Sequence, residues 1–116
     1  MSSVITLYGI KNCDSVKKSR KWLDKNSVEY AYHDFRLDGI EKSLIEEFLK
    51  NIEVRLLINK RSTSWKKLPD KEKTIRTKSE LVGLLLKNPT IIKRPIIKSK
   101  NIYFIGYDEE KFKLLK

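Results

Sequence analysis

The first third of the chain changes its hydrophobic periodicity twice, and this is the feature that most restricts the fold. Residues 4–8 are mostly β-branched and aromatic and stop at Gly9, as is typical of a buried strand. From Cys13 the apolar residues recur at helical spacing as far as Asn26, and residues 28–35 are again strand-like. A strand, a helix and a strand in this order predict a β-α-β unit with parallel strands and a right-handed crossover.

The remainder of the chain predicts helices first and then a hairpin. Helical spacing of apolar residues occurs in three segments: 41–50, 54–59 and 79–87. Two short apolar runs within residues 91–97, a strand over 102–105 and a last helix capped by Asp108 follow. We therefore expect one α/β domain over residues 1–116, with a partly antiparallel sheet and a helical insertion at about 40–88.

The chain is strongly basic. Lys and Arg number 26 against 15 Asp and Glu, so the formal net charge is +11 at pH 7. Such a charge attracts anions, including nucleic acids and acidic proteins. However, most basic residues are lysines spread along the chain, and few alternate with aromatic residues. We therefore favour a solvated basic surface over a nucleic-acid groove and expect no direct DNA binding.

Signals for export or membrane insertion are not evident in the sequence. The longest apolar runs are too short to cross a bilayer, and the first residues do not combine a basic leader with an apolar block. The single cysteine cannot form an internal disulfide, which suits a reducing compartment. We expect a cytoplasmic monomer without membrane contact.

The single cysteine, Cys13, lies where the first strand is followed by the helix, with Asn12 as a candidate N-cap. The unpaired N–H groups of a helix N-terminus favour an anion such as a thiolate, an oxyanion or a substrate carboxylate. Lys11, Lys17 and Lys18 add positive potential, which Asp14 opposes. Because the thiolate is the nucleophilic form, this position favours a reactive cysteine. The alternative is a buried cysteine that only packs, and the polar residues on both sides argue against it.

Other residues with possible chemistry are few. His33 is the only histidine and falls in the predicted second strand, where a hydrogen-bonded or exposed histidine is commoner than a catalytic base. One cysteine and one distant histidine do not have the spacing of a metal site, so we expect no metal. Trp22 and Trp65 are better explained as packing residues than as stacking platforms.

Four segments resemble the ArsC/Spx superfamily, which has the thioredoxin-like fold, and most closely its YffB-like branch. They are residues 8–18 (YGIKNCDSVKK), 34–39 (DFRLDG), 60–68 (KRSTSWKKL) and 91–97 (IIKRPII). The cysteine motif alone would be weak, but the segments match in order and spacing over nearly the whole chain. The resemblance implies a thioredoxin-like β-α-β unit, a β-hairpin and a helix, with a helical insertion after the second strand.

The resemblance also implies roles for individual residues. In arsenate reductases of this superfamily a cysteine attacks an oxyanion, arginines hold the negative charge, and glutathione resolves the adduct. Cys13 matches the nucleophile, Arg94 the arginine before the proline and Arg61 the second arginine. Arginine suits this task because it stays charged and can donate two parallel hydrogen bonds. Pro95 matches the proline that is cis in thioredoxin-like folds and faces the active thiol.

Two departures from the family pattern restrict the function. The reductases carry a third arginine on the following strand, whereas residues 103–107 contain none, which argues against arsenate reduction. Regulators of the Spx type have a second cysteine three residues after the first and use the pair as a disulfide switch. Val16 stands at that position here, so an intrachain switch cannot form.

We therefore expect a glutathione-dependent thiol oxidoreductase with one nucleophilic cysteine. Glutathione would be a co-substrate rather than a tightly bound cofactor, and the substrate a small thiol, disulfide or oxyanion. Lys11 and Asn12 are candidates for binding the oxyanion or glutathione, although Lys11 is equally well explained as an exposed loop lysine. Two alternatives stay open: an arsenate reductase coupled to glutaredoxin, and an Spx-like regulator that binds RNA polymerase through the basic residues 60–78.

Overall fold

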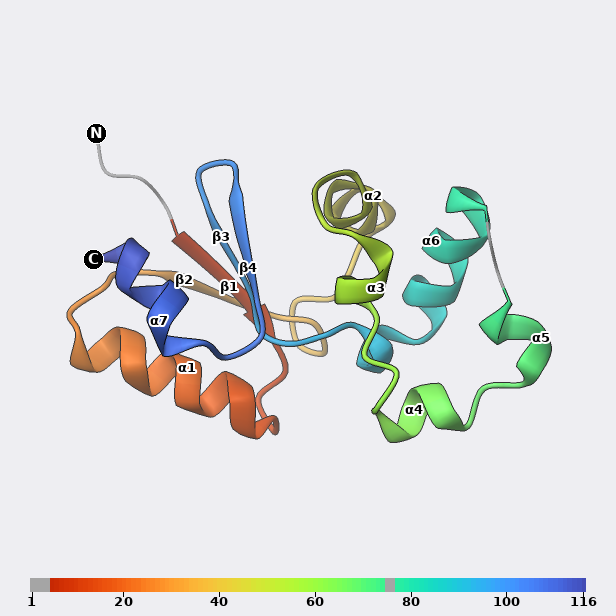
Figure 1. The fold of residues 1–116 in the computed structure, drawn as a ribbon, viewed down its shortest axis with the longest axis horizontal. Helices are drawn as coiled ribbons and strands as arrows, with labels where there is room; N and C mark the ends of the chain where they lie inside the picture. The colour runs from red at the N-terminus through yellow and green to blue at the C-terminus, as the bar shows by residue number, and fades with distance from the viewer. Residues whose placement is uncertain (1–4, 75–76) are drawn as a thin grey trace. The chain divides into compact units, whose positions relative to one another are not determined.

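A computed structural model describes residues 5–74 and 77–116 of the chain. The chain is divided into two compact units. The first, the sheet unit, combines Met1–Gly39 with Arg94–Lys116, and the second, the helical unit, is Ile40–Lys93. Figure 1 shows that every labelled strand belongs to the sheet unit.

The sheet unit contains a four-stranded mixed sheet in the order β2-β1-β3-β4 (Figure 1). Its strands are β1 (Ile5–Gly9), β2 (Ala31–Asp34), β3 (Ile96–Ser99) and β4 (Ile102–Ile105). β1 runs parallel to β2 and antiparallel to β3, and β3 runs antiparallel to β4. The predicted β-α-β unit, the hairpin and the partly antiparallel sheet are therefore confirmed.

Helices α1 (Asp14–Lys25) and α7 (Glu109–Phe112) cover one face of this sheet, and a short 3-10 helix, η2 (Lys113–Leu115), closes the chain. The core between helices and sheet is apolar, and its buried members come from three sources: Ile5, Leu7, Ile97 and Phe104 from the strands, Val16 and Leu23 from α1, and Phe112 from α7. The ring centroids of Trp22 and Phe112 are 5.6 Å apart, so Trp22 packs as predicted. Asp108 caps α7, also as predicted, by accepting hydrogen bonds from two N–H groups of its first turn.

The second predicted strand is shorter than the sequence suggested. Residues 28–35 were expected to be extended, but β2 begins only at Ala31. The residues before it end α1 instead: Ser27 has a positive φ of 57°, and Val28 donates its N–H to the carbonyl of Leu23 at 2.9 Å. The C-terminus of α1 therefore uses backbone hydrogen-bonding groups that a longer β2 would have needed for pairing.

The helical unit packs around two ten-residue helices, α2 (Lys42–Asn51) and α6 (Lys78–Lys87). Shorter helices lie between and after them: α3 (Val54–Leu57), α4 (Thr63–Lys66), α5 (Asp70–Lys73) and the 3-10 helix η1 (Pro89–Ile91). The predicted helices at 41–50, 54–59 and 79–87 are thus confirmed within a few residues. The first apolar run of the expected hairpin, at Ile91 and Ile92, is not a strand, because it ends η1 and makes an isolated bridge to Ile58.

In the two ranges that the structure describes, no helix has both the length and the apolar character needed to cross a bilayer.

Gly9, the last residue of β1, allows α1 to approach the sheet closely. A Cβ atom added at Gly9 would lie 2.6 Å from Cγ2 of Val16, which is shorter than any real contact of this kind. Val16 is 1% exposed, and its branched side chain has little rotamer freedom in a helix. Any larger residue at position 9 would therefore push α1, and with it the start of the helix, away from β1.

We predict that Gly9→Ala lowers the free energy of unfolding by about 1–3 kcal/mol, because the added methyl overpacks the contact with Val16. Adding Val16→Ala should restore part of the loss, so that the double variant is more stable than the sum of the single effects implies. Urea unfolding followed by circular dichroism measures this.

Gly83 provides the matched control. It lies within α6, and a Cβ atom added there would have nothing within 4 Å, so Gly83→Ala should stabilise the protein by about 0.5–1 kcal/mol. Strictly additive effects at positions 9 and 16 would contradict the proposed contact.

Candidate functional site

Cys13 is the N-cap residue of α1. Its backbone is extended (φ −121°, ψ 123°), and its carbonyl accepts the first helical hydrogen bond, from the Lys17 N–H at 3.0 Å. Its side chain is a free thiol, partly exposed, that packs beside the core of the sheet unit. Among the described residues no side chain caps this helix by a hydrogen bond, so the first-turn N–H groups are left to favour an anion at the thiol.

The prediction that Asn12 is the N-cap is wrong. Asn12 is exposed and lies in the turn between β1 and α1, one residue before the cap. Backbone conformation decides the cap, and it is Cys13 whose carbonyl already takes part in the helix while its own torsions are extended. The helix thus begins one residue later than predicted, and the Cys13 thiol lies at the cap instead of within the first turn.

The turn before Cys13 is held by Asp34, the last residue of β2. Asp34 is 2% exposed, and its carboxylate accepts four hydrogen bonds. The donors are the N–H groups of Lys11 (3.1 Å), Arg36 (2.8 Å) and Leu37 (3.2 Å) and the Tyr32 hydroxyl (3.0 Å). One buried carboxylate therefore joins β2, the turn after it and the backbone two residues before the thiol.

These contacts set the protonation states of Asp34 and Tyr32. Burial by itself would raise the pKa of Asp34, but its backbone and hydroxyl donors outweigh burial, so the pKa of Asp34 lies below its ordinary value. Burial and the hydrogen bond to Asp34 raise the pKa of Tyr32 to about 12. At neutral pH the carboxylate is consequently ionised, and the hydroxyl is protonated and donates to it.

Asp34 and Tyr32 were not among the predicted site residues. The sequence offered one signal for a role of Asp34: it is an acidic residue between a predicted strand and the turn at Asp38–Gly39. This segment otherwise only supports the family resemblance. The link to the cysteine turn could not be seen, because its donor, Lys11, is 23 residues away along the chain, whereas the other three donors lie within three residues of Asp34.

The Arg94–Pro95 peptide bond is cis, as the resemblance implied. Pro95 is buried and directly precedes β3, in which Ile96 pairs with Tyr8 of β1. Because β3 is antiparallel to β1, the cis bond lies at the end of the sheet where β1 leads to Cys13. The Pro95 carbonyl accepts a hydrogen bond from the Gly106 N–H at 2.8 Å, which fixes this turn to the segment that follows β4.

The sheet unit thus brings five of the predicted site residues to one end of the sheet: Lys11, Asn12, Cys13, Arg94 and Pro95. Arg61 belongs to the helical unit, where its side chain is exposed and its N–H donates to Oδ1 of Asn59 at 3.1 Å. The role of Arg61 at the site stays a prediction.

His33 lies in β2 as predicted, and its Nε2 is 2.8 Å from the carbonyl oxygen of Gly39. Its ring also packs 5.2 Å from that of Tyr8, so His33 is a hydrogen-bonded structural residue. Within the described residues, no three His, Cys, Asp or Glu side chains gather in a way that could hold a metal ion.

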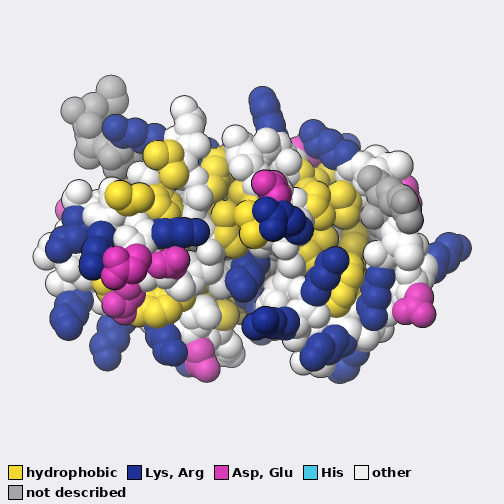
Figure 2. Space-filling view, in the orientation of Figure 1, with side chains coloured by type: hydrophobic (Ala, Val, Ile, Leu, Met, Phe, Trp, Pro, Cys, Tyr) yellow, Lys and Arg dark blue, Asp and Glu magenta, His cyan; other side chains and the backbone are white. Residues whose placement is uncertain are grey.

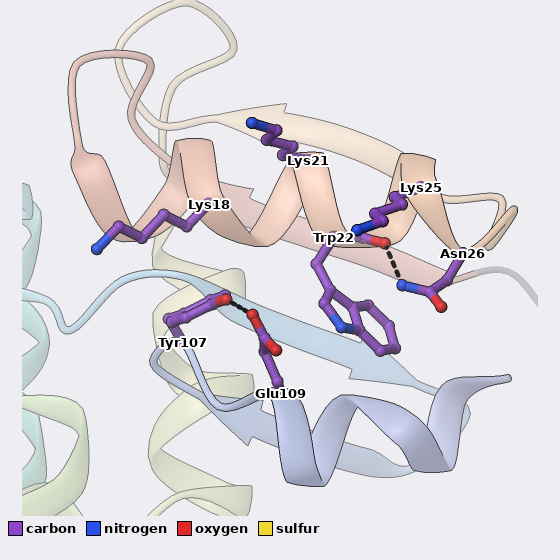
Figure 3. A pocket seen from close by; sticks show the side chains of 7 residues that line it. All are labelled: Lys18, Lys21, Trp22, Lys25, Asn26, Tyr107 and Glu109. Carbon is purple, nitrogen blue, oxygen red and sulfur yellow. Dashed lines mark hydrogen bonds between the residues drawn. The ribbon is translucent and has the colours of Figure 1, made fainter.

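Hollows lie along the exposed sides of α1. The first, drawn in Figure 3, is a groove between α1 and the start of α7, with the half-buried Trp22 and Tyr107 in it and Lys18, Lys25 and Glu109 around them. It does not include Cys13. On the face drawn in Figure 2, Lys and Arg side chains are scattered among uncharged and hydrophobic surface.

We predict that Asp34→Asn lowers the free energy of unfolding at pH 7 by about 2–3 kcal/mol, since an amide cannot accept all four hydrogen bonds. Because the folded pKa of Asp34 lies below its unfolded value, its stabilising effect is present above about pH 4 and is lost as pH falls through the folded pKa. The difference between wild type and variant should therefore shrink in acid, measured by urea unfolding at several pH values. Glu29→Gln, at an exposed residue of the same unit, is the control, and a pH-independent difference would contradict the assignment.

Comparison with known proteins places this site in a family. The model of the ArsC family matches residues 8–115. An uncharacterized protein of Haemophilus influenzae is 40% identical over 109 residues, which cover 94% of this chain and 96% of the relative. The global transcriptional regulator Spx of Streptococcus mutans is 29% identical over 112 residues, covering 95% of this chain and 81% of the regulator.

Solved structures agree. A YffB protein superposes with a TM-score of 0.89 at 29% identity, covering 96% of this chain and 97% of that one. An arsenate reductase (ArsC) related protein from Brucella melitensis gives a TM-score of 0.78 at 30% identity, covering 98% and 95% of the two chains. The match over nearly the whole length includes both the cysteine turn and the Arg94–Pro95 turn. This chain belongs to the ArsC family.

Proposed function

We propose that the protein is a glutathione-dependent thiol oxidoreductase in which Cys13 is the nucleophile. The observation that carries the proposal is the position of Cys13: a partly exposed thiol at the N-cap of α1, at the same sheet end as the cis Arg94–Pro95 bond. A thiolate there is favoured by the first-turn N–H groups of α1 and can be reached by another molecule.

In the proposed reaction the Cys13 thiolate attacks a sulfur of a mixed disulfide between glutathione and a substrate thiol. A bond forms between Sγ of Cys13 and the glutathione sulfur, and the substrate leaves as its reduced thiolate. The thiolate of a second glutathione then attacks this adduct, forms glutathione disulfide and releases Cys13. The mixed disulfide is reduced, which releases the substrate as a thiol. The glutathione from the mixed disulfide and the second glutathione end as one disulfide, so electrons balance without a bound cofactor.

An external thiol is needed for the second step because the chain contains one cysteine. The residue one helical turn after Cys13 is Val16, which is 1% exposed and packs against Gly9. The adduct on Cys13 therefore has no thiol of its own chain to attack it, and a small thiol of high cellular concentration suits the requirement.

Arginine residues would support the substrate's negative charge. Arg94 directly precedes the cis bond at the site, and the family resemblance gives Arg61 as the second arginine. Residues 103–107 lack the third arginine that arsenate reductases of this family use. We therefore expect weak arsenate reduction at most, even with glutaredoxin supplied.

We predict that Cys13 of the folded protein reacts with iodoacetamide at pH 7 faster than free cysteine does, and that incubation with glutathione disulfide yields one glutathione per chain. Cys13→Ser should abolish both the adduct and turnover of a glutathione mixed disulfide, measured with glutathione reductase as the coupling enzyme. Mass spectrometry and the coupled assay test this. Alkylation no faster than for free cysteine, or turnover that survives Cys13→Ser, would reject the proposal.

A second candidate function is transcriptional regulation, which the Spx relative favours because it matches 95% of this chain. In that case the basic stretch of residues 60–78 would bind RNA polymerase, and Cys13 would not be needed. Part of this stretch is folded, because helix α4 within it is capped by Ser62. It also presents cations: Nζ of Lys60 lies 5.8 Å from the centroid of the Trp65 ring.

If regulation is the function, the immobilised protein should bind purified RNA polymerase. The Cys13→Ser variant should bind it equally well. Lys66→Glu combined with Lys67→Glu, both at exposed positions, should abolish retention. Failure of the wild-type protein to bind the purified polymerase would reject this candidate.

A further inference from the structure

A second hollow on α1 lies near the turn that carries Cys13, although Cys13 itself does not line it. It is a surface cavity of about 320 Å³, and its lining residues are Lys11, Val16, Lys17, Arg20, Lys21 and Asp24. All of them belong to the sheet unit, and four of the six carry positive charge.

This cavity continues from the turn that carries the thiol. Lys11 lies two residues before Cys13, and the Lys17 N–H donates to the Cys13 carbonyl at 3.0 Å. Positions 13, 17, 20 and 24 are spaced by three or four residues, so they follow one face of α1. A molecule bonded to the Cys13 sulfur and extending along this face of α1 would therefore meet this row of side chains.

The cationic side chains near the cavity are partly held in place. Arg20 donates from Nε to the Tyr30 hydroxyl at 3.1 Å, and its guanidinium lies 4.1 Å from the centroid of the Tyr32 ring. The Lys11 backbone is fixed by Asp34. Among the described lining residues the one carboxylate, that of Asp24, lies 11 residues after Cys13, or about 16 Å along the helix axis. The lining of the cavity near the thiol is therefore positive, while the Asp14 carboxylate in the first turn of α1 offsets part of that charge.

The groove between α1 and α7 provides a contrast along the same helix. Lys18 and Lys25 line the groove between α1 and α7, where Trp22 and Glu109 are also found, while Lys21 contributes to both hollows. In Figure 3 the Lys21 side chain extends from the side of α1 away from α7. Lys17 and Lys18 are thus adjacent exposed lysines of equal charge, but only Lys17 lines the cavity near the Cys13 turn.

We propose that this cavity is a carboxylate-binding subsite that makes Cys13 selective for disulfides carrying carboxylates near the reacting sulfur. The inference rests on the proposed function of Cys13 and adds a substrate class to it. A carboxylate held by Lys17 and Lys21 places the neighbouring disulfide at the thiol before attack. Sγ of Cys13 then bonds to one sulfur, and the other sulfur leaves as a thiolate. A neutral disulfide undergoes the same exchange without this positioning.

The test compares glutathione disulfide with its fully esterified form, which has the same reacting sulfurs but no carboxylates. The rate of mixed-disulfide formation on Cys13 is measured for each by mass spectrometry, and the ratio of the two rates is divided by the ratio for free cysteine. We expect this normalised ratio, the rate with the acid over the rate with the ester, to be clearly greater than one in the wild-type protein. Lys17→Gln and Lys21→Gln should each reduce it about two- to fivefold, as for a partly exposed ion pair.

Lys18→Gln and Lys25→Gln are the matched controls, because each removes one positive charge from a lysine of α1 that does not line the cavity. They should change the preference little. An equal effect of Lys17→Gln and Lys18→Gln, or a normalised preference of one, would overturn the subsite while leaving fast reaction at Cys13 intact. Slow reaction of Cys13 with both disulfides would instead reject the proposed function, and the subsite with it.

Discussion

The buried carboxylate of Asp34 is the interaction on which the site of the sheet unit depends. An ionised carboxylate left unpaired in a protein interior costs several kcal/mol, whereas each hydrogen bond to a charged group returns about 1.5–3 kcal/mol. Four donors are therefore enough to keep Asp34 ionised, and they come from three parts of the chain. Through the Lys11 N–H this carboxylate fixes the turn before the thiol, and through Tyr32 it orders the ring on which Arg20 rests.

The topology of the sheet explains why separate segments meet at Cys13. Parallel β1 and β2 end at the same side, with Gly9 paired to Asp34, and antiparallel β3 begins there with the residue after Pro95. Three connections therefore converge at one sheet end: the cysteine turn, the turn after β2 and the cis Arg94–Pro95 turn. Because Gly9 lets α1 approach β1, the helix N-terminus is brought to the same place.

Local sequence patterns predicted the elements that local forces determine. The strand ending at Gly9, the helix containing Val16 and Leu23, and the Asp108 cap were all readable because spacing and capping depend on neighbouring residues. The start of β2 was predicted too early because a helix ending and a strand beginning compete for the same backbone groups. The contact of Asp34 with the Lys11 N–H could not be predicted, since these residues are 23 apart in sequence and are brought together only by the folded sheet. The cis bond came from family resemblance, because local sequence favours trans at any single proline.

The packing of Val16 beneath Gly9 has a kinetic consequence for any oxidised form of this protein. In a chain with two neighbouring thiols, an adduct collapses in a first-order step whose rate is set by the protein alone. Here the neighbouring position is filled by a sealed aliphatic side chain, so decay of the adduct is second order. Its lifetime then scales inversely with the free thiol around it, and the modified fraction of the protein would follow the redox state of the surrounding pool.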